Sequence, residues 1–121
     1  MRIFKHRVFH LWARDEGLAN QLIESAINEI GQGLFEANLG SGLYKKRVAR
    51  KGKGKRSGYR TLIAFKHNDK AVLMYGFAKN ECENISDKEK EIYKRLAKYY
   101  LDITDMQLNV LIRNGELIEV T

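Results

Sequence analysis

Residues 59–77, YRTLIAFKHNDKAVLMYGF, contain two apolar runs separated by the turn-forming residues His67, Asn68 and Asp69. Each run has the length and the β-branched and aromatic content of a strand. The stretch therefore predicts an antiparallel pair with strands at residues 59–66 and 71–77. A third strand is predicted at residues 43–49, and we expect the rest of the chain to pack against this meander.

Helices are expected before the meander. Residues 2–5 fit a short strand, and a helix is predicted to follow through residues 8–12. Apolar residues at three- and four-residue intervals predict a second helix, with Gly31 and Gly33 at its end. These apolar residues are Leu18, Leu22, Ile23, Ala26, Ile27 and Ile30.

Helices are also expected after the meander. Ser86 and Glu89 have the spacing of a capping box, in which a hydroxyl and a carboxylate satisfy free amides at a helix start. Thr104 and Gln107 have the same spacing and predict a second, short helix. Residues 116–120 are expected to form either an added edge strand or a loose tail. The apolar stripe of the first of these helices is expected to comprise Ile92, Leu96, Tyr99, Tyr100 and Ile103.

This order of elements predicts one domain, residues 1–121, with a C-terminal extension from about residue 104. The expected fold is α+β, with a small antiparallel β-sheet, N-terminal helices packed on one of its faces, and one or more C-terminal helices. A chain of 121 residues is long enough to bury a modest core without disulfides.

Composition excludes several classes of protein. Hydrophobic residues make up 44% of the chain, which is too many for a disordered protein. No apolar run reaches the length of a membrane span, and the N-terminus lacks the features of a secretory signal. The sequence has one cysteine, Cys82, so an internal disulfide is excluded. We therefore expect a soluble, cytoplasmic protein.

Positive charge is concentrated in residues 44–60. Nine of the 22 Lys and Arg residues lie there without an acid, whereas the rest of the chain has 13 against all 15 Asp and Glu residues. This segment therefore accounts for the formal net charge of +7. Such a focused patch is typical of a protein that binds a polyanion. The alternative is a solvated loop, although solubility is better served by interspersed signs.

Strand parity predicts where the central cations point. Alternate residues of a strand share a face, so Arg60 is expected on the face opposite to the core-facing row of Tyr59 and Ile63. Either Lys45 or Lys46 joins Arg60, depending on which row of the preceding strand faces the helices. We expect a bare sheet face with cations and aromatic side chains, suited to an RNA phosphate and a stacked base.

Other chemistries fit the sequence less well. Residues 52–58, GKGKRSG, do not match the G-x-x-x-x-G-K-[ST] pattern of a phosphate-binding P-loop. His6, His10 and His67 are dispersed, so no metal site is expected, and no other cofactor is expected either. Acidic neighbours on both sides of Cys82 argue against a reactive thiolate.

A site built from cations remains. Arginine can stabilise the negative charge that accumulates on a phosphate during transfer. RNA supplies its own nucleophile, the 2′-hydroxyl group, and crowded lysines can lower one another's pKa so that one of them accepts a proton. These arguments do not separate a ribonuclease from an RNA-binding module.

Residues 42–65, GLYKKRVARKGKGKRSGYRTLIAF, and residues 75–81, YGFAKNE, carry a family resemblance. They resemble the RelE/HigB superfamily of bacterial toxins, particularly its HigB-like branch. The resemblance implies a small antiparallel sheet flanked by helices and an mRNA interferase that cleaves messenger RNA in the ribosomal A site without a metal. It also implies a cognate antitoxin protein that binds the toxin tightly and with it commonly represses the operon.

The resemblance further implies roles for individual residues. Arg60 would bind the scissile phosphate and stabilise its charge in the transition state. Lys45 and Arg47 match the two basic positions of the preceding strand, and Lys79 matches a lysine after the third strand. Asn80 stands where RelE itself has an arginine, which is one departure from the family pattern.

A second departure is Ser86, which stands where RelE has a tyrosine and which we interpret as a helix cap. Because arginine does not readily lose its proton, proton acceptance would fall to Lys45 or to a loop lysine, Lys53 or Lys55. The loop is expected to grip RNA. The residues expected to contact RNA are Arg50, Lys51, Lys53, Lys55, Arg56 and Tyr59.

The leading hypothesis is therefore a ribosome-dependent, metal-independent endoribonuclease toxin. Its expected partners are the ribosome, mRNA, a cognate antitoxin of the helix-turn-helix type and, through that antitoxin, operator DNA. The alternative is a relative that acts on a protein target such as DNA gyrase, like the ParE branch, or a component that only binds nucleic acid.

Overall fold

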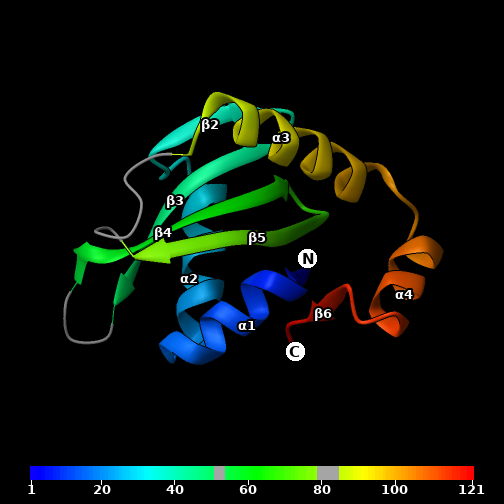
Figure 1. Ribbon diagram of the computed structural model, residues 1–121, viewed down its shortest axis with the longest axis horizontal. Helices are drawn as coiled ribbons and strands as arrows, with labels where there is room; N and C mark the ends of the chain where they lie inside the picture. The colour runs from blue at the N-terminus through cyan, green and yellow to red at the C-terminus, as the bar shows by residue number, and fades with distance from the viewer. Residues whose placement is uncertain (51–53, 79–84) are drawn as a thin grey trace.

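The computed structural model describes residues 1–50, 54–78 and 85–121, and the side chains of residues 54–57 lie outside the description. These residues build a six-stranded sheet in the order β2–β3–β4–β5–β1–β6 (Figure 1). The strands are β1 (Arg2–His6), β2 (Ala37–Gly40), β3 (Leu43–Arg50), β4 (Gly54–Lys66), β5 (Lys70–Ala78) and β6 (Leu117–Glu119). The helices are α1 (Arg7–Glu16), α2 (Asn20–Gly31), α3 (Asp87–Asp102) and α4 (Asp105–Arg113).

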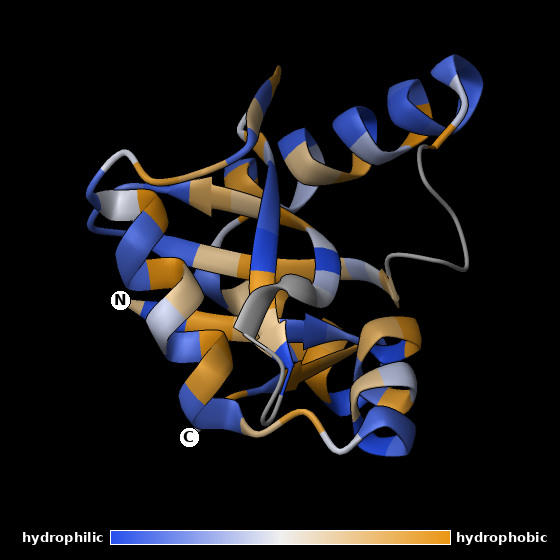
Figure 2. Ribbon diagram, turned by 90° about the vertical axis from the view of Figure 1, so that its left-hand side faces the viewer, coloured by the Kyte–Doolittle hydropathy of each residue, from blue (hydrophilic) through white to orange (hydrophobic). Residues whose placement is uncertain are grey.

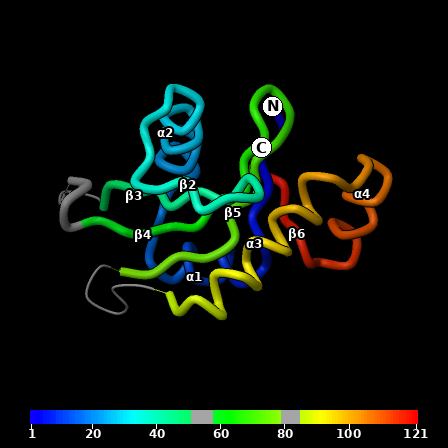
Figure 3. Tube along the Cα trace, turned by 90° about the horizontal axis from the view of Figure 1, so that it is seen from above, coloured from blue at the N-terminus to red at the C-terminus, as the bar shows by residue number. Residues whose placement is uncertain are grey.

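The sheet is antiparallel except where β1 lies beside β5. β1 is parallel to β5 and antiparallel to β6, which brings the two chain termini close together (Figure 3). The predicted meander of β3, β4 and β5 is confirmed, and the C-terminal residues form an edge strand instead of a loose tail. The other edge strand, β2, was missed because its four residues, ANLG, contain only one strongly apolar side chain.

Helices cover both faces of the sheet. α1 and α2 pack on one face, where Phe9 and Ile27 meet Ile63, and α3 and α4 lie on the other, where Tyr100 joins Leu62 (Figure 1). The expected position of the N-terminal helices is therefore correct, but the opposite face is not bare. The physical reason is that both rows of β4 are apolar, so each row is buried under its own pair of helices.

Both predicted capping boxes are present. Ser86 Oγ accepts a hydrogen bond from the Glu89 amide at 3.1 Å, and Thr104 Oγ1 accepts one from the Gln107 amide at 3.2 Å. The predicted stripe of α3 is only partly correct, because about half of the Ile92 surface is exposed. Tyr99 is similarly exposed, and the residues of α3 that are buried are Ala97, Tyr100 and Leu101. Figure 2 shows hydrophilic and hydrophobic segments alternating along the helix.

The basic segment forms a long hairpin. β4 begins at Gly54, five residues earlier than predicted, and Arg50 at the end of β3 is the register partner of Gly54. The expected loop at residues 50–56 is therefore wrong at its ends, because the ladder of β3 and β4 continues through an irregularity after Val48. No helix in the described ranges has the length and hydropathy needed to cross a membrane.

Candidate functional site

Arg47 of β3 and Arg60 of β4 are direct register partners, and Phe77 of β5 is the partner of Arg60 on the other side. Residues that face each other in an antiparallel pair share one face of the sheet. Leu62, two residues after Arg60, packs in the cluster under α3. The row of Arg47, Arg60 and Phe77 therefore lies on the α3 side, and the face expected for Arg60 is correct.

The two arginines differ in their partners. Arg47 Nε lies 3.7 Å from Glu36 Oε1, and the Arg47 backbone amide donates to Glu36 Oε2 at 2.7 Å. The half-buried Arg60 side chain forms no hydrogen bond or ion pair with any of the described residues. Like charges placed opposite each other destabilise a sheet. The row therefore carries positive charge that a bound anion would neutralise.

Lys45 and Lys46 point to opposite faces. Lys46 is 2% exposed, and its Nζ forms an ion pair at 2.9 Å with Glu29 Oε1 on α2. Lys45 is the register partner of Leu62, so it lies on the α3 side with Arg60. Of the two alternatives left open by parity, Lys45 is the residue that joins the arginine row.

A groove of about 100 Å³ lies beside the arginine row, between the sheet and the start of α3. Its lining residues are Leu39, Lys45, Leu62, Phe77, Ile85 and Lys90. The sequence-based interpretation missed Lys90 of α3. The available signal was spacing, because Lys90 precedes Tyr93 by three residues and Ala97 by seven, which places it on the side of the helix that meets the sheet.

Tyr59 and Arg50 lie on the other side of the sheet. Tyr59 is 4% exposed, and its ring packs edge to face with Trp12, with the two ring centroids 5.0 Å apart. The Arg50 guanidinium lies 5.5 Å from the centroid of the Tyr59 ring. Tyr59 Oη donates to the Glu16 carbonyl at 3.3 Å, and burial, with the nearby Glu16 carboxylate, raises the pKa of Tyr59. The expected stacking of a base on Tyr59 is therefore not supported, because the ring is covered and faces away from Arg60.

The chain also matches a known protein family. A family model described as the RelE toxin of the RelE/RelB toxin–antitoxin system matches residues 1–120. The chain belongs to the RelE toxin family. It is thus the toxin of a toxin–antitoxin system, and its partner is a cognate antitoxin. The match includes the segment from residue 104, which was expected to be a C-terminal extension. No curated protein sequence matches the chain.

Several predicted catalytic and RNA-binding residues of this RelE-family toxin lie outside the described residues. Lys51, Lys53 and Lys79 belong to the segments that are not described. Lys55 and Arg56 lie within β4, but their side chains are not described. Their contacts with RNA, and the assignment to the HigB-like branch, stay predictions.

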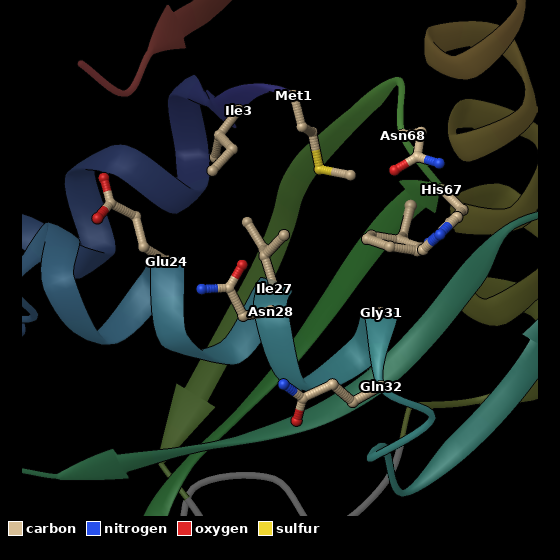
Figure 4. A pocket seen from close by; sticks show the side chains of 10 residues that line it. Met1, Ile3, Glu24, Ile27, Asn28, Gly31, Gln32, His67 and Asn68 are labelled. Carbon is tan, nitrogen blue, oxygen red and sulfur yellow. The ribbon is translucent and has the colours of Figure 1, made fainter.

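A cavity of about 570 Å³ lies away from the candidate site of the toxin. It lies between α2 and the turn joining β4 to β5, where Figure 4 shows Glu24 and Asn28 on one side and His67 on the other. Ile27 and Phe65, which also line it, belong to the core under α1 and α2. The cavity therefore opens on the face opposite to Arg60. In the part of the chain that is described, His, Cys, Asp and Glu residues do not gather in groups of three that could hold a metal.

Proposed function

We propose that this RelE-family toxin is a ribosome-dependent endoribonuclease that cleaves mRNA without a metal ion. The observation that carries the proposal is the opposed pair of Arg47 and Arg60, of which Arg60 has no carboxylate partner among the described residues. An arginine held in this way on a strand can bind a phosphate group. Membership of the RelE family supports RNA as the molecule that supplies this phosphate.

The reaction balances with RNA as its own nucleophile. The 2′-oxygen attacks the adjacent phosphorus, the bond from phosphorus to the 5′-oxygen breaks, and a 2′,3′-cyclic phosphate and a 5′-hydroxyl end are formed. A proton leaves the 2′-hydroxyl group and another reaches the departing 5′-oxygen. The protein has to align these atoms and stabilise the charge on the non-bridging oxygens.

Arg60 is assigned to the non-bridging oxygens of the scissile phosphate. Arg60 is a half-buried residue, and electrostatic stabilisation strengthens where water is partly excluded. Arg47 would hold the same phosphate from the opposite strand, because a guanidinium stays protonated and cannot act as the base. Lys45 is assigned to proton acceptance, with Lys53 or Lys55 as alternatives, and Lys79 to a further phosphate contact.

The partners follow from the same proposal. The toxin would act on mRNA in the ribosomal A site, and its antitoxin would be of the helix-turn-helix type, which would allow the pair to bind operator DNA. As a cytoplasmic protein it would reach translating ribosomes without transport.

Induction of the toxin in a bacterial host tests the proposal. Growth, primer extension on abundant mRNAs and DNA breaks would be measured for the native chain, Arg60→Ala and Arg113→Ala, whose arginine is exposed at the end of α4. The proposal expects mRNA cleavage with the native chain and Arg113→Ala, and none with Arg60→Ala. Intact mRNA with accumulating DNA breaks would instead identify a protein target such as gyrase.

A further inference from the structure

α3 carries a lysine where a helix packed on a sheet usually has an apolar residue. Lys90 lies one turn before Tyr93 and two turns before the fully buried Ala97, on the side that meets the sheet. Its side chain is 37% exposed. Packing alone would be served better by an apolar side chain at this position, so Lys90 requires another explanation.

Lys90 and Lys45 line the same groove from two different elements. The groove has apolar walls made by Leu62 and Phe77 on the sheet and Ile85 before α3, and no acidic residue is among the described residues that line it. The carboxylate paired with Lys90 is Asp87 Oδ1 at 3.8 Å, on the same helix and with a fully exposed side chain. Such a pair contributes little, because water screens it. The Lys90 ammonium group at this small groove, so weakly paired, favours an anionic ligand.

The groove continues directly from the arginine row. Phe77 lines the groove and is also the register partner of Arg60. Lys45 precedes Arg47 by two residues on the same face of β3, which is about 7 Å along the strand. A single-stranded RNA with one phosphate at Arg60 therefore places its neighbouring phosphate within reach of the groove.

We infer that Lys90 is a further RNA-contacting residue, which together with Lys45 binds the phosphate next to the scissile one. In this arrangement Lys45 stays protonated, and proton acceptance falls to Lys53 or Lys55. The RNA strand then passes between the sheet and the first turns of α3. This inference rests on the proposed function, because it assigns a second phosphate position to the same substrate. Lys90 touches no reacting atom in this arrangement, so it contributes to binding and alignment more than to bond breaking.

The salt dependence of RNA binding distinguishes a direct contact between Lys90 and a phosphate from a general attraction of RNA to positive charge. For a single-stranded RNA oligonucleotide, each phosphate contact adds about 0.7 to the slope of log K against log salt concentration. Lys90→Met should therefore lower the slope by about 0.7. Lys88→Met is the matched control. The substitution removes the same charge, and Lys88 lies on the exposed side of α3 with Ile92. It should leave the slope nearly unchanged.

Cleavage on programmed ribosomes gives a second readout. Lys90→Met should raise KM about tenfold with a much smaller change in kcat, since one charged hydrogen bond is lost. Lys90→Arg should restore most of the binding. If Lys90→Met does not fold, the reversals Lys90→Glu and Lys88→Glu replace the pair, and only Lys90→Glu should lose binding strongly.

Failure of the inference on Lys90 and failure of the proposed function would give different results. If Lys90→Met matches Lys88→Met in slope and KM while Arg60→Ala still abolishes cleavage, the inference on Lys90 is overturned and the proposed function stands. If the native toxin neither binds nor cleaves RNA, the proposed function fails and the inference fails with it.

Discussion

Arg47 and Arg60 stand directly opposite each other on β3 and β4, on the face of the sheet that α3 covers only in part. An arrangement of two like charges lowers the stability of the sheet, and only Arg47 has a carboxylate partner among the described residues. The pair is therefore explained better by the binding of an anion than by folding.

The adjacent residues Lys45 and Lys46 should behave in opposite ways. Lys46→Met removes one partner of a buried ion pair with Glu29 and should lower the free energy of unfolding by about 2–3 kcal/mol. Lys45→Met, on the other face, should leave stability nearly unchanged and weaken RNA binding. Urea denaturation and RNA titration on both variants check this, and equal losses of stability would contradict the assigned faces.

Glu36 should restrain RNA binding. Its carboxylate is paired with Arg47 and competes with a phosphate for that guanidinium. Glu36→Gln keeps an acceptor for the Arg47 amide but removes the charge, so RNA affinity should rise about threefold, as expected for an exposed ion pair. Asp15→Asn makes the same charge change beside Arg14 on α1 and is the control. Equal effects of the two variants would show that only net charge matters.

Gly76 should be required for the packing of α1 on the sheet. A Cβ at Gly76 would collide with the ring of Trp12, which is held between Phe9 and Tyr59. Gly76→Ala should therefore lower the free energy of unfolding by about 1–3 kcal/mol. Gly31→Ala is the control, because its Cβ would make only an ordinary contact with Phe65. A Gly76→Ala variant as stable as Gly31→Ala would show that the ring can move aside.

The contact of Arg2 with Glu119 should make stability depend on pH. Arg2 donates from Nε and Nη2 to the two carboxylate oxygens at 3.0 Å, and these hydrogen bonds hold the pKa of Glu119 below its usual value of 4.5. The free energy that this pair contributes to folding is fully present above pH 4.5. It is lost as the pH falls through the lowered pKa of Glu119.

A double-mutant cycle of Arg2→Met and Glu119→Gln measures this contribution. The coupling free energy should be about 1 kcal/mol or less at pH 7, since both side chains are about one-third exposed. It should shrink towards zero as the pH falls through the lowered pKa of Glu119, where the carboxyl group becomes protonated. A coupling that does not change as the pH falls through this range would rule out this pair as the origin.

Much of the fold could be predicted because its signals are local. The capping boxes at Ser86 and Thr104, and the apolar runs of β4 and β5, depend on neighbouring residues alone. The sequence of β4 could also have predicted that the second face of the sheet is covered. Leu62 and Ala64 form an apolar row, which a solvent-exposed face would not need. Because of this row, the expected face open to RNA is covered.

The candidate site was less predictable, because it depends on contacts between distant segments. Parity placed Arg60 correctly but could not choose between Lys45 and Lys46, since that choice depends on where α2 lies. The burial of Tyr59 follows from Trp12, more than forty residues earlier in the chain. Lys90 belongs to the groove only because α3 crosses the sheet beside Lys45.

The most direct test of the central claim is single-turnover cleavage of an mRNA on programmed ribosomes by purified native toxin, Arg60→Ala and Arg113→Ala. Loss of the main phosphate-binding group should reduce the cleavage rate of Arg60→Ala by at least about 100-fold, while Arg113→Ala cleaves like the native toxin. Both variants should keep antitoxin binding and a thermal stability at least equal to that of the native toxin. Cleavage by Arg60→Ala at the native rate would contradict the account.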